Sequence, residues 1–155
     1  FSAALVTAIV DAATADAMNI VPNAANRFVA ETDPVNGSAP YKYVSVVARL
    51  ENPASDLRIL LDAYKDVNAD FRVFVKTQGE SDAGNINDKS WVEVVMPSLP
   101  DSVDLTDFKE HDVTLGADVP GWDSTFIAFQ IKITGRTKNP CKPPIFRNLR
   151  AIALT

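Results

Sequence analysis

Residues suited to catalysis are few in this chain of 155 residues, which has a single cysteine, Cys141, and a single histidine, His111. A lone cysteine excludes a disulfide within the chain and a thiolate metal cluster, and a lone histidine excludes a multi-histidine zinc or iron site. Cys141 and His111 form the one pair available for papain-like chemistry. The sequence contains no glycine-rich phosphate loop, no G-x-S-x-G elbow and no dinucleotide fingerprint. We therefore expect a protein that is not an enzyme and binds no cofactor.

Carboxylates offer two further kinds of site. Asp101 with Asp104, or Glu110 with Asp112, would serve as the acid and base of a glycosidase if they faced each other across a cleft. With twenty acids in the chain, however, neighbouring carboxylates are expected by chance. The loop over residues 79–90 gathers oxygen ligands of the kind that calcium prefers, but the spacing matches no EF-hand, and a solvated connection between strands has the same composition. These ligands are Glu80, Asp82, Asn85, Asn87 and Asp88. We expect no metal site.

Aromatic residues raise the possibility of sugar binding, which requires a flat, exposed ring. The candidates are Trp91, Trp122, Tyr41 and Tyr43. Packing in the core is the commoner fate of such side chains. Tyr41 and Tyr43 project from the less apolar face of their predicted strand, so they are the better candidates for a carbohydrate platform.

Charge is divided unevenly along the chain, whose formal net charge is −5. All twenty acids lie at or before Asp123, whereas the last 32 residues carry six cations and no acid. One interpretation is pairing across strands, with Arg147 and Arg150 beside acids of neighbouring strands. The other is a head-to-tail interface, in which the basic loop "GRTKNPCK" contacts a partner. The residues of that loop expected to bind the partner are Arg136, Lys138 and Lys142. The negative net charge argues against nucleic acid.

Alternation of apolar and polar residues predicts the elements that must position these side chains. It indicates strands over residues 41–50, 57–62, 71–76, 91–96, 108–115, 124–134 and 145–155. In the strand over 124–134 the residues Ile127, Phe129, Ile131 and Ile133 share a face. The segment "KDVNAD" is typical of a turn, so we predict a hairpin between the strands 57–62 and 71–76. Both faces of the closing strand are expected to be buried.

Ten prolines fall almost entirely between these runs, where a missing backbone donor does no harm. The pattern predicts an all-β fold, an antiparallel β-sandwich like a jelly roll, over residues 40–155. Residues 1–39 are expected to be an N-terminal arm or an extra element. Their apolar start lacks a basic leader and is interrupted by Asp11, so we expect no membrane insertion. Because the chain begins at Phe1, we expect either a processed product or a piece of a longer polypeptide, and we favour the piece.

Four motifs together resemble a known family. They are "DLRILLDAY" (Asp56 to Tyr64), "DFRVFVK" (Asp70 to Lys76), "FQIKI" (Phe129 to Ile133) and "NLRAIAL" (Asn148 to Leu154). Their order and spacing, over about residues 40 to 155, resemble a β-sandwich domain of virion structural proteins in contractile-tailed bacteriophages, found in baseplate and tail-fibre-associated polypeptides. The family usually has a proline-bearing turn where this chain has "KDVNAD", and the first forty residues match no part of it.

The resemblance implies a structural component of a phage tail or baseplate that is assembled in the host cytoplasm. It implies other virion proteins as partners, a homo-oligomer within a symmetric assembly, and no catalytic or metal residues. A rival interpretation is a carbohydrate-binding module for host-surface glycans, because jelly-roll modules of that kind also end in a strand of the "x-N-h-R-h-x-h" type. A tail enzyme that cleaves glycans is a third, and it would need a working pair of carboxylates.

Overall fold

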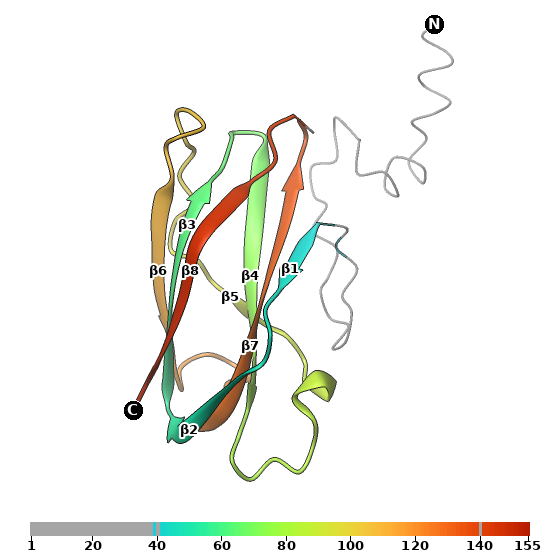
Figure 1. Ribbon diagram of the computed structural model, residues 1–155, viewed down its shortest axis with the longest axis vertical. Coiled ribbons are helices and arrows are strands. Elements are labelled where there is room, and N and C mark those ends of the chain that lie inside the picture. Colours follow the sequence, from blue (N-terminus) through green and yellow to red (C-terminus); the bar gives the residue numbers. More distant parts are fainter. Residues whose placement is uncertain (1–38, 40, 140) are drawn as a thin grey trace, which may run out of the picture.

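The computed structural model describes residue 39 and residues 41–139 and 141–155, which form a sandwich of two antiparallel sheets (Figure 1). One sheet contains β1 (Lys42–Val44), β2 (Ala48–Ala54), β4 (Ala69–Gln78), β5 (Val92–Val94) and β7 (Phe126–Thr137). The other contains β3 (Asp56–Tyr64), β6 (Lys109–Leu115) and β8 (Ile145–Leu154). A 3-10 turn, η1 (Ile86–Asp88), lies between β4 and β5. The predicted all-β antiparallel sandwich is confirmed, whereas the predicted arm lies outside the described residues apart from Ala39.

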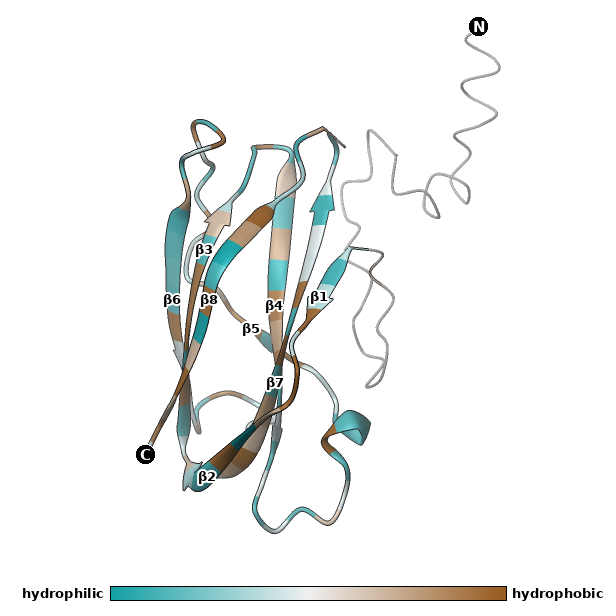
Figure 2. Cartoon of the chain, in the orientation of Figure 1, coloured by the Kyte–Doolittle hydropathy of each residue, from teal (hydrophilic) through white to brown (hydrophobic). Residues whose placement is uncertain are grey.

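The core lies between the sheets and is built by the alternation seen in the sequence. Side chains of β3, β4 and β7 that point inward are apolar, and Figure 2 shows the resulting bands of hydropathy along the strands. Burial of each such side chain contributes roughly 1.5–3 kcal/mol. The most deeply buried members are Leu57, Ile59, Leu61, Phe71, Val73, Val75, Phe126, Ile131 and Ile133. Ile127, which we expected on this face, lies outside the core cluster.

The connection between β3 and β4 crosses from one sheet to the other, so the predicted hairpin is wrong. β3 pairs with β6 and β8, while β4 pairs with β5 and β7. Both edges of each of these two strands are therefore occupied by other strands, and β3 and β4 do not pair with each other. The turn itself is local: Ala69 N donates to Asp66 O at 2.8 Å, and Asn68 N donates to Asp66 Oδ1 at 3.0 Å. The turn residues were predictable, but the layer that each strand enters was not.

The predicted strand over residues 41–50 is two strands with opposite facing. Tyr43 pairs with Ile133 and points between the sheets, whereas beyond the break Ala48 and Leu50 pack against the core. Ser45 bridges the break, because its N–H donates to Ile131 O at 2.8 Å and its Oγ accepts from Ile131 N at 3.0 Å. The Oγ of Ser45 thus replaces a backbone carbonyl as the acceptor for Ile131 N. Beyond this point, the residues that face the core shift by one position along the chain.

Strand β8 is an edge strand, which corrects the expectation that both of its faces are buried. It pairs with β3 alone, and Ile152 on its outer face is 45% exposed. A bulge lies at Asn148, whose φ is 52°, a left-handed conformation that asparagine tolerates better than most residues. Asn148 Nδ2 donates to Asp62 Oδ2 at 2.7 Å. The extra residue lets both Phe146 and Leu149 contact the core.

Candidate functional site

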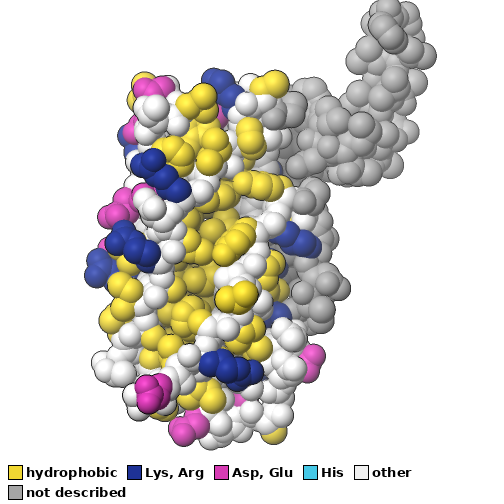
Figure 3. Space-filling view, in the orientation of Figure 1, with side chains coloured by type: hydrophobic (Ala, Val, Ile, Leu, Met, Phe, Trp, Pro, Cys, Tyr) yellow, Lys and Arg dark blue, Asp and Glu magenta, His cyan; other side chains and the backbone are white. Residues whose placement is uncertain are grey.

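An apolar groove of about 600 Å³ runs between β1 and β8 and is the best candidate for a binding surface. We call it the β1–β8 groove. Figure 3 shows hydrophobic side chains gathered along the middle of this face of the molecule. The groove is lined by Tyr41, Tyr43, Ile133, Pro143, Pro144, Ile145, Phe146, Arg147, Asn148 and Leu149. Its mostly apolar lining with a few polar groups is typical of a binding site.

The groove exists because both sheets end on this side of the sandwich. β8 is the last strand of one sheet, and β1 and β2 pair with β7 alone in the other. Among the described residues no strand lies between β1 and β8, so side chains that would face a neighbour in a closed sandwich reach the surface. The fold therefore leaves a strand-sized opening along one edge.

Tyr41 forms one wall of the groove and is held there. Its hydroxyl donates to Pro144 O at 3.0 Å, and its ring stacks on Phe146 with centroids 6.3 Å apart. A Cβ added to Gly135 would lie 2.4 Å from the Tyr41 ring, so only glycine permits this approach. Burial raises the pKa of the Tyr41 hydroxyl. Tyr41 joins β1 to the start of β8; it is 42% exposed, but its hydroxyl and its contact with Phe146 are already used within the chain.

Tyr43, in contrast, keeps its ring available. It is 51% exposed, and it lines the same groove as Tyr41, the residue before β1. We expected the two tyrosines on the less apolar face of their strand, and that face is the one directed between the sheets. Both tyrosines therefore line the β1–β8 groove because their face of the strand is directed between the sheets, and not because it is directed to solvent.

The two tryptophans have other partners. Trp122 packs edge-on against Phe126 with centroids 5.3 Å apart, and its Nε1 donates to Ser55 O at 3.0 Å. Trp91 lies against two buried lysines, since the Nζ atoms of Lys76 and Lys132 are each 4.5 Å from its ring centroid. Such cation–π contacts hold the ring against the sheet. Neither tryptophan is a flat exposed platform.

A row of four aromatic rings crosses the sandwich from the groove to β6. Phe146 packs edge-on against Phe71 with centroids 5.1 Å apart, and Phe71 packs edge-on against His111 with centroids 5.5 Å apart. With Tyr41 stacked on Phe146, the row is continuous. Burial lowers the pKa of His111, which is 6% exposed. Cys141 is exposed in the turn before β8, and no contact joins it to His111 among the described residues.

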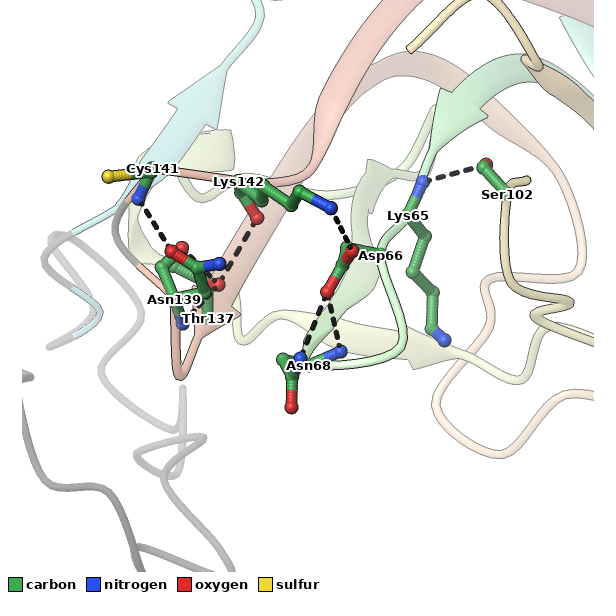
Figure 4. Close-up of polar contacts among 8 residues, drawn as sticks. All are labelled: Lys65, Asp66, Asn68, Ser102, Thr137, Asn139, Cys141 and Lys142. Atoms are coloured by element: carbon green, nitrogen blue, oxygen red, sulfur yellow. Dashed lines mark hydrogen bonds and ion pairs between the residues drawn. The ribbon is translucent and has the colours of Figure 1, made fainter. Parts of the chain in front are cut away.

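The β7–β8 loop, of which residues 138, 139 and 141–144 are described, is fastened to the β3–β4 turn (Figure 4). Thr137 Oγ1 donates to Asn139 O at 2.8 Å, and Asn139 Oδ1 accepts from Cys141 N at 3.0 Å. Lys138 N donates to Asn68 O at 2.9 Å. The backbone of the loop is thus fixed by its own polar side chains and by the neighbouring turn.

The three residues expected to bind a partner differ in how much of their charge is available. Arg136 pairs with Asp70 at 3.6 Å, directly across the β4–β7 ladder, and Lys142 pairs with Asp66 at 3.3 Å. Lys138 is exposed, and within the described residues its side chain makes no ion pair. A hydrogen bond from Asn68 N is the main cause of the lowered pKa of Asp66, and Lys142 adds to it. Two of the three cations are therefore partly neutralised within the chain.

The other basic residues near the end of the chain follow the cross-strand interpretation. Arg147 lies 3.5 Å from Asp62, and Arg150 lies 3.3 Å from Glu110. Arg58 forms two bonds with Asp112, of 2.9 and 2.5 Å, and these lower the pKa of that carboxyl. Glu110 and Asp112 thus lie exposed on an outer face beside arginines, without a cleft between them.

The remaining acidic candidates also have structural partners. Asp101 pairs with Lys65, and Asp104 caps its own turn by accepting from Thr106 N at 2.7 Å. In the loop over residues 79–90, a bond from Lys89 is the main cause of the lowered pKa of Asp82. Asn85 caps η1 by accepting from Asn87 N. No group of three or more acidic, histidine or cysteine side chains suited to a metal gathers in the described part of the chain.

The β8 side of the groove was not predicted from the sequence. This side consists of Pro143, Pro144, Ile145, Phe146 and Leu149, an apolar run broken by polar residues. A signal was present, because "PPIF" is apolar where a loop normally carries polar residues. That these residues face Tyr41 and Tyr43 follows from the pairing of the sheets, which the sequence alone does not reveal.

Comparison of the chain with protein-family models, with curated proteins and with solved structures finds no match. In the described residues, no helix has the length and apolarity needed to cross a membrane. The geometry is that of a two-sheet sandwich with one apolar open edge. Its chemistry suits binding of an apolar or aromatic surface.

Proposed function

We propose that this chain is a structural component of a tailed-phage virion, a baseplate or tail-fibre-associated protein that acts through contacts with other virion proteins and with copies of itself. The four motifs that resemble the phage family fall on β3, β4, β7 and β8, the long strands of the two sheets. The motifs thus belong to the scaffold, as expected for a family without catalytic residues. The groove and the neighbouring loop are the surfaces through which the scaffold makes contacts.

The β1–β8 groove is the observation that carries this proposal. Contiguous exposed apolar surface is uncommon on monomeric proteins and marks sites of association. Here the exposed Tyr43 and Ile145 border a groove whose floor is Ile133 of the core. A partner that fills the groove removes this surface from water, which stabilises the complex by about 25 cal/mol for each Å² of apolar area. The edge is therefore a contact surface of an assembly protein.

The test is incorporation of a groove variant into the particle. Tyr43→Asp places a charge in the groove at a half-exposed position, so we expect the Tm to change little while the amount of the chain in purified particles falls at least about tenfold. Val46→Asp is the matched control, because Val46 is 86% exposed on the adjoining turn and outside the groove. Normal incorporation of Tyr43→Asp would overturn the proposal.

The β7–β8 loop adds a second, weaker contact through Arg136, Lys138 and Lys142. Exposed charges govern the choice and orientation of a partner more than its affinity. Because Arg136 and Lys142 already pair with Asp70 and Asp66, Lys138 is the cleanest residue to vary. We expect Lys138→Glu to leave the Tm unchanged and to reduce incorporation less than Tyr43→Asp does. A Lys138→Glu variant that incorporates at the parent level would remove the loop from the contact surface.

A carbohydrate-binding module is the alternative, and the exposed ring of Tyr43, in a groove that Asn148 also lines, favours it. An aromatic face with a neighbouring amide suits the apolar face and hydroxyls of a sugar. Binding to a glycan array that is lost in Tyr43→Ala and retained in Val46→Ala would support this function. Absence of glycan binding by the parent chain would exclude it.

A further inference from the structure

We propose that the β7–β8 loop of one copy of this chain docks into a cleft between β5 and β6 of a second copy, so that copies join head to tail. The inference deepens the contact role of the loop and rests on the proposed function, in which the chain contacts copies of itself. It is carried by the lining and charge of the cleft, by the charge and fixed backbone of the loop, and by their places at opposite ends of the sandwich.

The β5–β6 cleft is an opening at the sheet edges opposite to β1 and β8, with a volume of about 600 Å³. Among the described strands, β5 pairs with β4 alone and β6 pairs with β3 alone, so each is the edge of its sheet. Valines of both strands and of the segments that adjoin them line the cleft, together with the carboxylates of Glu93 and Asp118. A lining of this kind suits a protein segment that carries both apolar and cationic side chains.

The negative charge at the cleft is only partly neutralised within the chain. Glu93 pairs with Arg72 at 3.3 Å, whereas Asp118 is exposed and makes no ion pair in the described residues. A Cβ added to Gly116 would collide with Asp56 and would lie 3.8 Å from Asp118 Oδ1, so the carboxylates of Asp56 and Asp118 are close neighbours. Asp56 also lacks an ion pair in the part of the chain that the structure describes. Two neighbouring anions repel each other, and a cation from a partner offsets this repulsion.

The β7–β8 loop supplies such a cation. Lys138 is exposed and makes no ion pair in the described residues, whereas Arg136 and Lys142 pair with acids of their own chain. The side chains of Thr137 and Asn139 fix the backbone of the loop. A loop fixed in this way loses little conformational freedom on binding, which lowers the entropic cost of docking. Because the attraction depends on the charge of Lys138, an uncharged side chain at this position also weakens the contact.

The loop and the acidic end of the cleft lie at opposite ends of the long axis of the sandwich (Figure 1). The β7–β8 loop joins the upper ends of its two strands, and the loop over residues 116–125, which carries Asp118, joins the lower ends of β6 and β7. Surfaces placed in this way do not meet within one molecule, but they meet between copies stacked end to end. Such heterologous contacts close into rings or extend as filaments. Tyr43 takes no part in them and stays available to other virion proteins.

Exchange of charge tests the proposal through self-association of the purified chain, measured by analytical ultracentrifugation. We expect Lys138→Glu and Asp118→Lys each to weaken association at least about tenfold, because each brings like charges together. An equimolar mixture of the two variants should associate to within about threefold of the parent, since each loop then meets a cleft of opposite charge. Arg49→Glu and Glu80→Lys are the matched controls, because both residues are exposed and lie outside the loop and the cleft. No recovery in the mixture, or no association of the parent up to about 1 mM, would overturn the proposal.

Disulfide trapping identifies the two surfaces in contact. Cys141 is exposed in the loop, so the unchanged chain is mixed with a tagged Cys141→Ser copy that carries Pro120→Cys in the cleft. We expect mild oxidation to join the two kinds of copy, and to join none when the tagged copy carries Val103→Cys, an exposed position outside the cleft. Cross-links between like copies alone would indicate a two-fold contact and overturn the head-to-tail arrangement. Incorporation of Tyr43→Asp into particles decides the virion role separately.

Discussion

The β7–β8 loop and the β1–β8 groove adjoin each other along the chain, yet they differ in what they leave for a partner. In the loop, the side chain of Thr137 donates to and accepts hydrogen bonds from the backbone of Asn139. Arg136 pairs with an acid of β4, and Lys142 pairs with an acid of the β3–β4 turn. In the groove, Tyr43 is exposed and apolar side chains remain uncovered. Cations that stand out in the sequence can thus be neutralised by acids within the fold. An uncovered apolar edge, in contrast, keeps its apolar surface area available for burial by a partner.

The largest effect on stability is expected at the base of the groove. Phe146 joins Tyr41 to Phe71 in the aromatic row, so Phe146→Ala removes two ring contacts and leaves a space beneath the groove. Because Phe146 is half-buried, we expect a loss of about 2–4 kcal/mol in the free energy of unfolding, at or below the usual cost for a buried phenylalanine. Urea denaturation measures it. Val46→Ala is the control, and a loss under about 1 kcal/mol for Phe146→Ala would show that the row does not support the groove.

A smaller effect is expected at the bulge that shapes the β8 side of the groove. Asn148 has a φ of 52°, which a β-branched residue strongly disfavours. We expect Asn148→Val to lower the free energy of unfolding by about 1–3 kcal/mol, through backbone strain and loss of the bond to Asp62. Asn148→Gly keeps the conformation and should be less destabilising. If the two variants were equally stable in urea, backbone conformation would not be what fixes the bulge.

The loop should respond more weakly than the groove. Asn139→Ala removes the acceptor for Cys141 N, and a single hydrogen bond of this kind contributes about 1 kcal/mol. Differential scanning calorimetry of Asn139→Ala beside Asn52→Ala, an exposed position on β2, measures the difference. A loss as large as that of Phe146→Ala would mean that the loop, rather than the core beneath the groove, holds this end of the sandwich together.

The smallest effect is a pH dependence at the far end of the aromatic row. Burial lowers the pKa of His111 below its ordinary value of 6.5, so just below that pH the unfolded chain binds more protons than the folded one. Its contribution to stability is complete above pH 6.5, declines as the pH falls, and is lost once the pH has passed the folded pKa. Nearby Asp62 reduces the shift. Because His111 is the only histidine, His111→Phe should flatten the stability profile between pH 5 and 6.5. An unchanged profile would contradict this assignment.

Much of the fold could be predicted because β3, β4, β7 and β8 alternate clearly along the chain. The exceptions lie where alternation shifts by one residue. At Ser45 the shift depends on a bond to Ile131, and at Asn148 it accompanies a bond to Asp62; each bond joins residues 86 apart in sequence. Contacts at such a distance cannot be inferred from a local pattern. The same limit explains why β3 and β4, adjacent in sequence, were wrongly paired.

The candidate site was predictable in part. Tyr41 and Tyr43 were identified as the aromatic residues most suited to binding, and both line the groove. The other wall could not be anticipated, because Phe146 and Leu149 approach the tyrosines through the edges of two separate sheets. Charge asymmetry indicated Arg136 and Lys142 as contacts, but the pattern does not show that Asp70 and Asp66 lie beside them.

The most direct test of the claim that the groove is the main contact surface is photo-cross-linking of the full-length chain, with benzoylphenylalanine at position 43 in one variant and at position 138 in another. In assembled particles we predict a strong product between position 43 and a neighbouring virion protein or a second copy of the chain, and a weak product or none from position 138. Cross-linking from position 138 with none from position 43 would contradict the account.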